Sequence, residues 1–346
     1  MIRNTLVEVL RIFSMLFIVG GHFASQGGLN FYFNIDNNFI FNFMSNGQRV
    51  SINIFLLISS WFLVEQKSSF KRIVKVWIHV FFYTAPITIL LFIFCGNVSM
   101  KELVQCFLPY VGRPLWFASA YISLLLLSPF LNKALQSKKD TIKKFLFSSF
   151  LIICFLPTFA KEMDTYICAV AWFCFIYMCV GYYKKYTVKC YTDHGFLLVL
   201  LGITLYVVMV YIHTYGYNPT IKNIAGRFLH DFKSLPNIIT AFLIFIGIIS
   251  MRNYNSECIN VIASGAFSVY IVHQIPALYM ELWKWMLNIM LSFKNISFNI
   301  MFCLSIICLY LFISIIDIPI RCCINKIIRS QNINNFIIKI DKLYNI

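Results

Sequence analysis

The feature that most constrains this fold is a succession of long apolar segments along a chain of 346 residues. Ten of them have roughly the 17 to 25 residues that an α-helix needs to cross the hydrocarbon core of a bilayer. A backbone in lipid must satisfy its own hydrogen bonds, so we expect each segment to be a helix. The expected spans are residues 6–24, 48–64, 73–95, 114–132, 145–160, 165–183, 195–213, 236–251, 263–284 and 296–317. The sequence therefore predicts an all-α, polytopic membrane protein.

The overall composition excludes a soluble domain of this length. Hydrophobic residues make up 60% of the chain and charged residues only 12%, with a mean hydropathy of +0.77. A soluble protein needs more polar side chains than this to cover its surface. Most of the twelve cysteines lie inside the apolar segments, and their spacing from the histidines matches no metal site. We therefore interpret them as small hydrophobic residues and expect no metal.

Positive charges are distributed unevenly among the connecting segments. The formal charge of +16 is compatible with nucleic acid or anionic lipid as a partner. With the N-terminus inside, 19 of the 29 Lys and Arg residues lie in cytoplasmic segments and 9 in outer ones. This bias predicts that both termini are cytoplasmic, and it favours the lipid bilayer over nucleic acid as a partner. Residues 214–235 run against the bias, so they are either a functional outer loop or a misplaced boundary.

The chain shows no internal repeat and no separate soluble domain. We expect a membrane domain over residues 1–320 and a basic cytoplasmic tail over residues 321–346. The tail alternates Asn, Lys and Ile, which is typical of an amphipathic helix on a membrane surface, with disorder as the alternative. The bias toward Lys, Asn, Ile and Phe favours the inner membrane of a bacterium as the location.

The first span carries ionisable residues, which are costly at membrane depth and mark function by default. Arg11 and His22 are eleven residues apart, so they project from nearly one helix face about 16 Å apart along the axis. The alternative for Arg11 is a side chain that reaches the inner headgroups and pairs with Glu8. The alternative for His22 is a hydrogen-bonded structural histidine.

The second and third spans add further candidates. Asn53 and Ser59 interrupt the second span, and such residues in membranes usually join helices by hydrogen bonds. Arg72 and Lys75 lie where the third span begins. They either anchor that end at the inner surface or attract a phosphorylated ligand.

The fourth and ninth spans also contain polar or interfacial residues. Trp116, with Arg113, is typical of a pair that fixes the depth of a helix end. His273 and Gln274 precede Pro276 in the ninth span, and a proline in a membrane helix often lies beside a cavity. His79 is a lone histidine that we interpret as a core residue.

Four stretches, taken in order, resemble the acyltransferase 3 family of membrane-bound acyltransferases. The resemblance spans residues 8–274, which is most of the chain, and the four ordered motifs are more specific than any one alone. Two motif positions, Ser51 and Ser60, differ from the glycine that is usual there, and RIVKVW before the third span lacks the usual proline. The four stretches are the R-x10-H pattern of Arg11 and His22, the run GQRVSINIFLLISSWFL, the run RPLWFASAYISLLLLSP, and SVYIVHQ.

The resemblance implies transfer of an acyl group, commonly acetyl from acetyl-CoA, to a hydroxyl of a sugar or polysaccharide. It implies that His22 is a general base and that His273 is a second base, a relay or a hydrogen bond to substrate. Arg11 would bind a phosphate of the acyl-CoA donor. The further assignments are Arg72 and Lys75 to the donor, and Asn53, Ser59, Trp116 and Gln274 to the carbohydrate acceptor.

This interpretation makes a geometric prediction and has a competitor. We expect Arg11 and His22 to face one cavity, with His273 on its opposite wall. The alternative function is a transporter that exports a polysaccharide or an acyl intermediate without transferring a group. An inverted repeat would favour transport, and none is detected.

Overall fold

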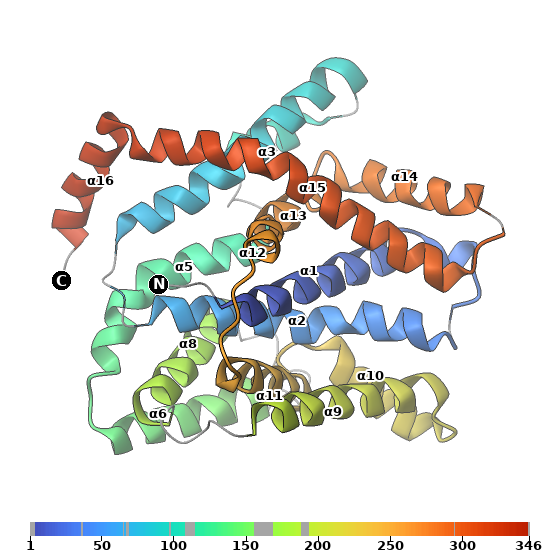
Figure 1. Cartoon of the computed structure of the whole chain (residues 1–346), viewed down its shortest axis with the longest axis horizontal. Helices are drawn as coiled ribbons and strands as arrows, with labels where there is room; N and C mark the ends of the chain where they lie inside the picture. The colour runs from blue at the N-terminus through green and yellow to red at the C-terminus, as the bar shows by residue number, and fades with distance from the viewer. Residues whose placement is uncertain are drawn as a thin grey trace.

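The computed structural model describes residues 4–35, 37–64, 66, 69–96, 98–107, 115–155, 169–187, 194–293 and 295–344. Within these ranges the chain folds into helices and contains no strand, which confirms the all-α prediction (Figure 1). The helices of the first half are α1 (Thr5–Gln26), η1 (Leu29–Phe31), α2 (Phe39–Leu63), α3 (Phe70–Cys95), α4 (Met100–Phe107), α5 (Trp116–Ala134), α6 (Lys139–Phe150), the π-helical turn η2 (Leu151–Phe155) and α8 (Ala169–Tyr186). Those of the second half are α9 (Gly195–Tyr215), α10 (Pro219–His230), α11 (Leu235–Ser250), α12 (Glu257–Ser264), α13 (Ala266–Val272), α14 (Tyr279–Ser292), α15 (Phe298–Arg329) and α16 (Gln331–Tyr344).

Helix length and apolarity support a polytopic membrane protein, but ten spans are not confirmed. Among the described residues, α1, α3, α5, α9 and α15 are long and apolar enough to cross a membrane. The pair α10 and α11 qualifies as a sixth span only if both helices count together across their 55° bend. Residues 156–160 of the expected fifth span and 165–168 of the sixth lie outside the described residues.

The expected ninth span, residues 263–284, is not one helix. It divides into α12, α13 and α14, with non-helical residues from His273 to Leu278. Pro276 lies inside this break, and a proline has no amide hydrogen with which to continue a helix. As a consequence, His273 lies at the C-terminal end of the short helix α13.

Helix α2 begins nine residues before the expected start of the second span. Asn38 caps it, and its side-chain oxygen accepts a hydrogen bond of 3.0 Å from the Phe41 amide. Gln48 and Arg49, which stand at the start of the expected span, are therefore inside α2. Helix α10 accounts for residues 219–230 of the segment 214–235, and both alternatives for this segment, a functional outer loop and a misplaced boundary, stay predictions.

Helices α1 and α2 lie side by side at the centre of the molecule (Figure 1). Their close approach depends on small residues, because a Cβ added at Gly21 of α1 would clash with Gln48 of α2, and one added at Gly47 of α2 would clash with Phe17 of α1. Figure 1 shows α3, α14 and α15 on one side of this pair and α8 to α11 on the other. One hydrophobic cluster fills each side, around Phe23 and Phe302 on the first and around Trp172 and Phe245 on the second.

The C-terminal residues form helices rather than a coil. Helix α15 continues without a break through residues 320 and 321, where we expected the tail to begin. Helix α16 packs on the start of α3, where Asp341 accepts hydrogen bonds from the Ser69 hydroxyl (2.9 Å) and the Phe70 amide (2.5 Å). The cytoplasmic location of both termini, the domain boundary and a membrane-surface position of α16 stay predictions.

Candidate active site

The structure joins the histidines of α1 and α13, which are 251 residues apart in the sequence. The Nδ1 atom of His22 lies 2.9 Å from the Nε2 atom of His273. On its other side, the Nδ1 atom of His273 lies 2.5 Å from the carbonyl oxygen of Val269, one turn back along α13. His273 is fully buried, whereas His22 is only partly buried.

This chain of contacts fixes where the protons are when both rings are neutral. A carbonyl oxygen can only accept, so the proton of His273 is on Nδ1 and its Nε2 carries a lone pair. That lone pair accepts a hydrogen bond from Nδ1–H of His22. The remaining nitrogen of His22, Nε2, is therefore unprotonated. An imidazole held in this tautomer is ready to take a proton from a neighbouring hydroxyl.

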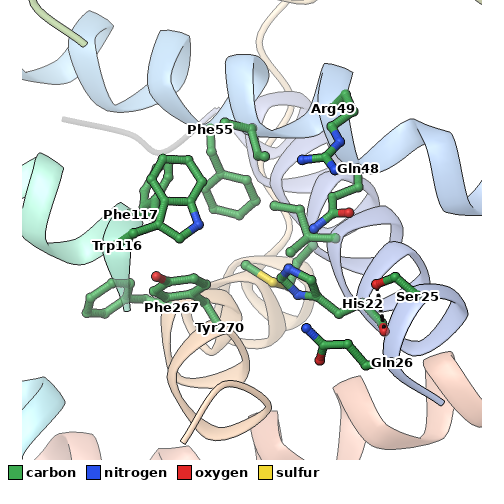
Figure 2. Close-up of a pocket in the computed structure, with 13 residues that line it drawn as sticks. His22, Ser25, Gln26, Gln48, Arg49, Phe55, Trp116, Phe117, Phe267 and Tyr270 are labelled. Atoms are coloured by element: carbon green, nitrogen blue, oxygen red, sulfur yellow. Dashed lines mark hydrogen bonds between the residues drawn. The ribbon is translucent and has the colours of Figure 1, made fainter. Parts of the chain in front are cut away.

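A cavity of about 260 Å³ lies next to His22. Figure 2 shows its polar side chains, which come from α1 and α2, facing an aromatic wall. The polar lining residues are His22, Ser25, Gln26, Gln48 and Arg49. The apolar and aromatic ones are Met15, Ile18, Ile52, Phe55, Trp116, Phe117, Phe267 and Tyr270. The cavity thus combines a base, several polar groups and a flat apolar surface.

The prediction that His273 lies on the opposite wall of a cavity shared by Arg11 and His22 is wrong. His273 is behind His22 and does not line the cavity. Met15 and Ile18 continue from His22 along the same face of α1 toward Arg11, but the cavity ends before Arg11. Arg11 and His22 belong to one continuous helix, but the open space beside His22 does not extend to Arg11.

Of the three cations assigned to the donor, Arg11 lies toward the N-terminal end of α1, and Arg72 and Lys75 lie near the start of α3. Arg11 pairs with Glu8, whose carboxylate oxygen is 2.6 Å from Nη1 of Arg11. Arg72 donates a hydrogen bond of 2.6 Å to the side chain of Gln66. Arg11 and Arg72 are both electrostatic neighbours of the Tyr121 hydroxyl on α5. They therefore lie near one point of the bundle, while Lys75 is exposed on α3.

Of the four residues assigned to the acceptor, Trp116 lines the cavity and the other three do not. Asn53 is buried and joins helices, because its amide donates to the Phe232 carbonyl (2.6 Å) and accepts from the Trp172 indole (3.1 Å). Gln274 is buried beyond His273 and donates to its carbonyl (3.2 Å). Ser59 is partly buried farther along α2. The companion of Trp116 in the expected interfacial pair, Arg113, lies outside the described residues.

Sequence reasoning missed several cavity residues. Gln48 and Arg49 lie within the motif run GQRVSINIFLLISSWFL, at the start of the expected second span, but neither is among the predicted site residues. Ser25 and Gln26 follow His22 by three and four residues, a spacing that places all three on one helix face. That spacing was the signal that could have identified them. Among the described residues, no group of His, Cys, Asp and Glu could hold a metal ion.

A second buried polar cluster surrounds His79 of α3, which we had interpreted as a lone core residue. Its Nε2 lies 2.7 Å from the Ser268 hydroxyl, which in turn donates to Asp317 of α15 (2.5 Å). Tyr83 also donates to this carboxylate (2.8 Å), and Arg321 lies 3.4 Å from its second oxygen. These residues do not line the His22 cavity.

Together, the fold and the site define a polytopic α-helical membrane protein with a histidine pair beside a small cavity. A family model described as an acyltransferase domain, the acyltransferase 3 model, matches residues 4–316, which is nearly the whole chain. The chain belongs to this family, as its four motifs predicted, and is a membrane acyltransferase in the general sense. Comparisons with curated proteins and with solved structures gave no match.

Proposed function

We propose that this protein is an O-acetyltransferase of a bacterial cell membrane. It transfers the acetyl group of cytosolic acetyl-CoA to a hydroxyl of a cell-surface or exported polysaccharide, or of its lipid-linked precursor. The observation that carries this proposal is the His22–His273 pair. The pair leaves one unprotonated nitrogen of His22 at a cavity large enough for the reacting groups.

In this mechanism His22 is the general base. Its Nε2 takes the proton of the acceptor hydroxyl as the oxygen attacks the thioester carbonyl, an effect typically worth about 100- to 10,000-fold in rate. The imidazolium that forms donates more strongly through Nδ1 to His273, which is 2.9 Å away. His273 is then a positioning residue, because it holds the tautomer of His22 and does not touch the substrate.

The donor reaches the cavity along α1. Arg11 and Arg72, near the N-terminal end of α1, would bind phosphates of coenzyme A, because a guanidinium matches a phosphate in charge and geometry. Lys75, exposed on α3, is a third cation that would contact the donor. The thioester then lies toward His22, past Met15 and Ile18.

The acceptor sugar lies against the aromatic wall. Trp116 offers a flat apolar face, and Ser25 and Gln26 offer hydrogen-bonding groups to hydroxyls. A cavity of about 260 Å³ is smaller than the roughly 300–1,000 Å³ usual for a whole small-molecule ligand. It therefore holds the reacting ends of the two substrates, with the rest of each outside.

The test uses purified protein in liposomes with acetyl-CoA labelled in the acetyl group and a panel of neutral and uronate-bearing oligosaccharides. Wild type is expected to transfer label to a glycan, and His22→Ala is expected to lose about 100- to 10,000-fold in rate. A matched control is His213→Gln, because His213 lies at the end of α9 outside the cavity. Equal transfer by wild type and His22→Ala contradicts the role of His22. Movement of glycan across the membrane without label transfer indicates a transporter.

A further inference from the structure

Arg49 is a cation of the cavity that acid–base chemistry at His22 does not require. It is partly buried on α2, and the described part of the chain gives its guanidinium no hydrogen bond or ion pair. Asp231, its electrostatic neighbour of opposite charge, accepts a hydrogen bond from the Lys233 amide (2.9 Å). Asp231 offsets part of this positive charge, and the N–H groups of the guanidinium are left to donate to a negatively charged group in the cavity. The cavity therefore has the chemistry of an anion site beside its base.

The position of Arg49 along the site follows from how α1 and α2 pack. The helices are antiparallel, since Gly20 and Gly21 lie against Met44 and Gln48, while Gly47 lies against Phe17. Arg49 is thus displaced from His22 toward the N-terminal end of α1. Figure 2 shows Arg49 and Gln48 on one side of His22, and Ser25 and Gln26 on the other.

The groups on the other side of His22 are neutral and can form hydrogen bonds with a hydroxyl of the acceptor. The Ser25 hydroxyl donates to the Gly21 carbonyl (2.9 Å), so its oxygen is left to accept. The Gln26 carbonyl oxygen accepts from the Trp283 indole (2.8 Å), so its amide nitrogen is left to donate. If the donor enters from the N-terminal end of α1, as in the proposed function, the acceptor hydroxyl lies on the Ser25 side. The thioester then lies on the Arg49 side.

We infer that Arg49 is a catalytic residue that stabilises the oxyanion formed from the thioester carbonyl, with the Gln48 amide as a second donor. This inference rests on the proposed function and deepens it. The acceptor oxygen bonds to the carbonyl carbon, its proton moves to Nε2 of His22, and the carbonyl electron pair moves to the oxygen beside Arg49. The carbonyl then re-forms and the carbon–sulfur bond breaks. The coenzyme A thiolate leaves and takes the proton from His22, which gives an ester and a free thiol.

The test measures kcat and KM for Arg49→Gln, with wild type and Arg252→Gln as controls, since Arg252 is exposed beyond α11. Loss of one preorganised oxyanion donor typically costs about 100- to 1,000-fold in kcat. We expect a loss of this size with both neutral and uronate-bearing oligosaccharides. We also expect the dissociation constant of acetyl-CoA to change little, because the interaction forms only in the transition state. That binding measurement also shows that the variant is folded.

Two results separate this inference from the proposed function. Transfer by wild type together with an unchanged kcat in Arg49→Gln overturns the role of Arg49 and leaves the proposed function intact. A rise in KM confined to uronate-bearing acceptors also overturns it, because Arg49 would then bind a carboxylate of the substrate. An absence of transfer by wild type overturns both. If Arg49→Gln does not fold, Arg49→Met keeps a long apolar stem without any N–H donor, and wild-type kcat in that variant contradicts the inference.

Discussion

Two polar clusters, one of His22 with His273 and one around His79, include residues from opposite ends of α13. Only the first has a histidine that faces a cavity. His273 ends α13 and holds His22 beside a cavity, whereas Ser268, in the first half of α13, contacts His79 in closed packing. The single hydrogen of the Ser268 hydroxyl goes to Asp317, so Nε2 of His79 must donate to the Ser268 oxygen. His79 thus presents a proton to the serine, and His22 presents a lone pair to the cavity.

This difference shows that a serine, a histidine and an aspartate in contact do not by themselves make an active site. A base must offer an unprotonated nitrogen to a space that a substrate can enter. In the His79 cluster Asp317 is fully buried and Arg321 is partly buried beside it, which is the arrangement of a structural ion pair. We therefore expect the His79 cluster to control stability and the His22 cluster to control rate.

The largest expected effect is on the stability of Asp317→Ala. The carboxylate is fully buried and accepts from Ser268 and Tyr83, so its loss leaves these donors and the Arg321 cation without a partner. Removing one member of a buried ion pair typically costs about 3–5 kcal/mol. Thermal unfolding in detergent should show a large drop in Tm, while kcat of the folded fraction at low temperature stays near that of wild type.

The exposed pair Glu281–Lys284 provides the matched control. Its charges are 2.8 Å apart, but both side chains are about 60% exposed. Such surface pairs contribute about 0–1 kcal/mol, so Glu281→Ala should leave Tm nearly unchanged. A kcat for Asp317→Ala as low as that of His22→Ala would show that the two clusters are not separate in function.

A smaller effect is expected for two variants of His273. His273→Asn keeps a short polar side chain but removes the acceptor for Nδ1–H of His22, and a lost buried hydrogen bond costs about 1–3 kcal/mol. This corresponds to roughly a 10- to 100-fold drop in kcat, with KM unchanged. His273→Gln places an amide oxygen farther out, where Nε2 was, and should recover part of that loss.

The comparison between these two variants distinguishes positioning from packing. Both shorten or reshape a fully buried side chain, so a purely structural role lowers the amount of folded protein in each without separating their kcat values. Equal kcat in His273→Asn and His273→Gln, measured per folded molecule, contradicts the positioning role.

The sequence predicted the first helix and its polar face well, because α1 spans residues 5–26 and its pattern depends on local spacing alone. It did not predict where α2 begins. Asn46, Gln48 and Arg49 have the composition of a loop, yet they are helical, and two of them line the cavity. Polar residues around a buried site carry the same composition signal as an exposed turn.

Contacts between residues that are far apart in the sequence cannot be predicted from a local sequence pattern. The four motifs identified His22 and His273 as candidates, but only packing decides that one ring is 2.9 Å from the other. In the same way, Asp317 lies in an apolar stretch of α15, and nothing near it in the sequence points to His79 of α3. Pro276 indicates an irregularity in the ninth span. It does not predict that α13 ends at His273.

The most direct test of the central claim is the protonation of the two ring nitrogens of His22. Solid-state nitrogen-15 NMR of histidine-labelled protein in liposomes at neutral pH distinguishes a protonated from an unprotonated ring nitrogen. The His22 signals are assigned by their loss in His22→Ala. We expect a proton on Nδ1 and a lone pair on Nε2 of His22. A proton on Nε2 with a bare Nδ1 would contradict this expectation.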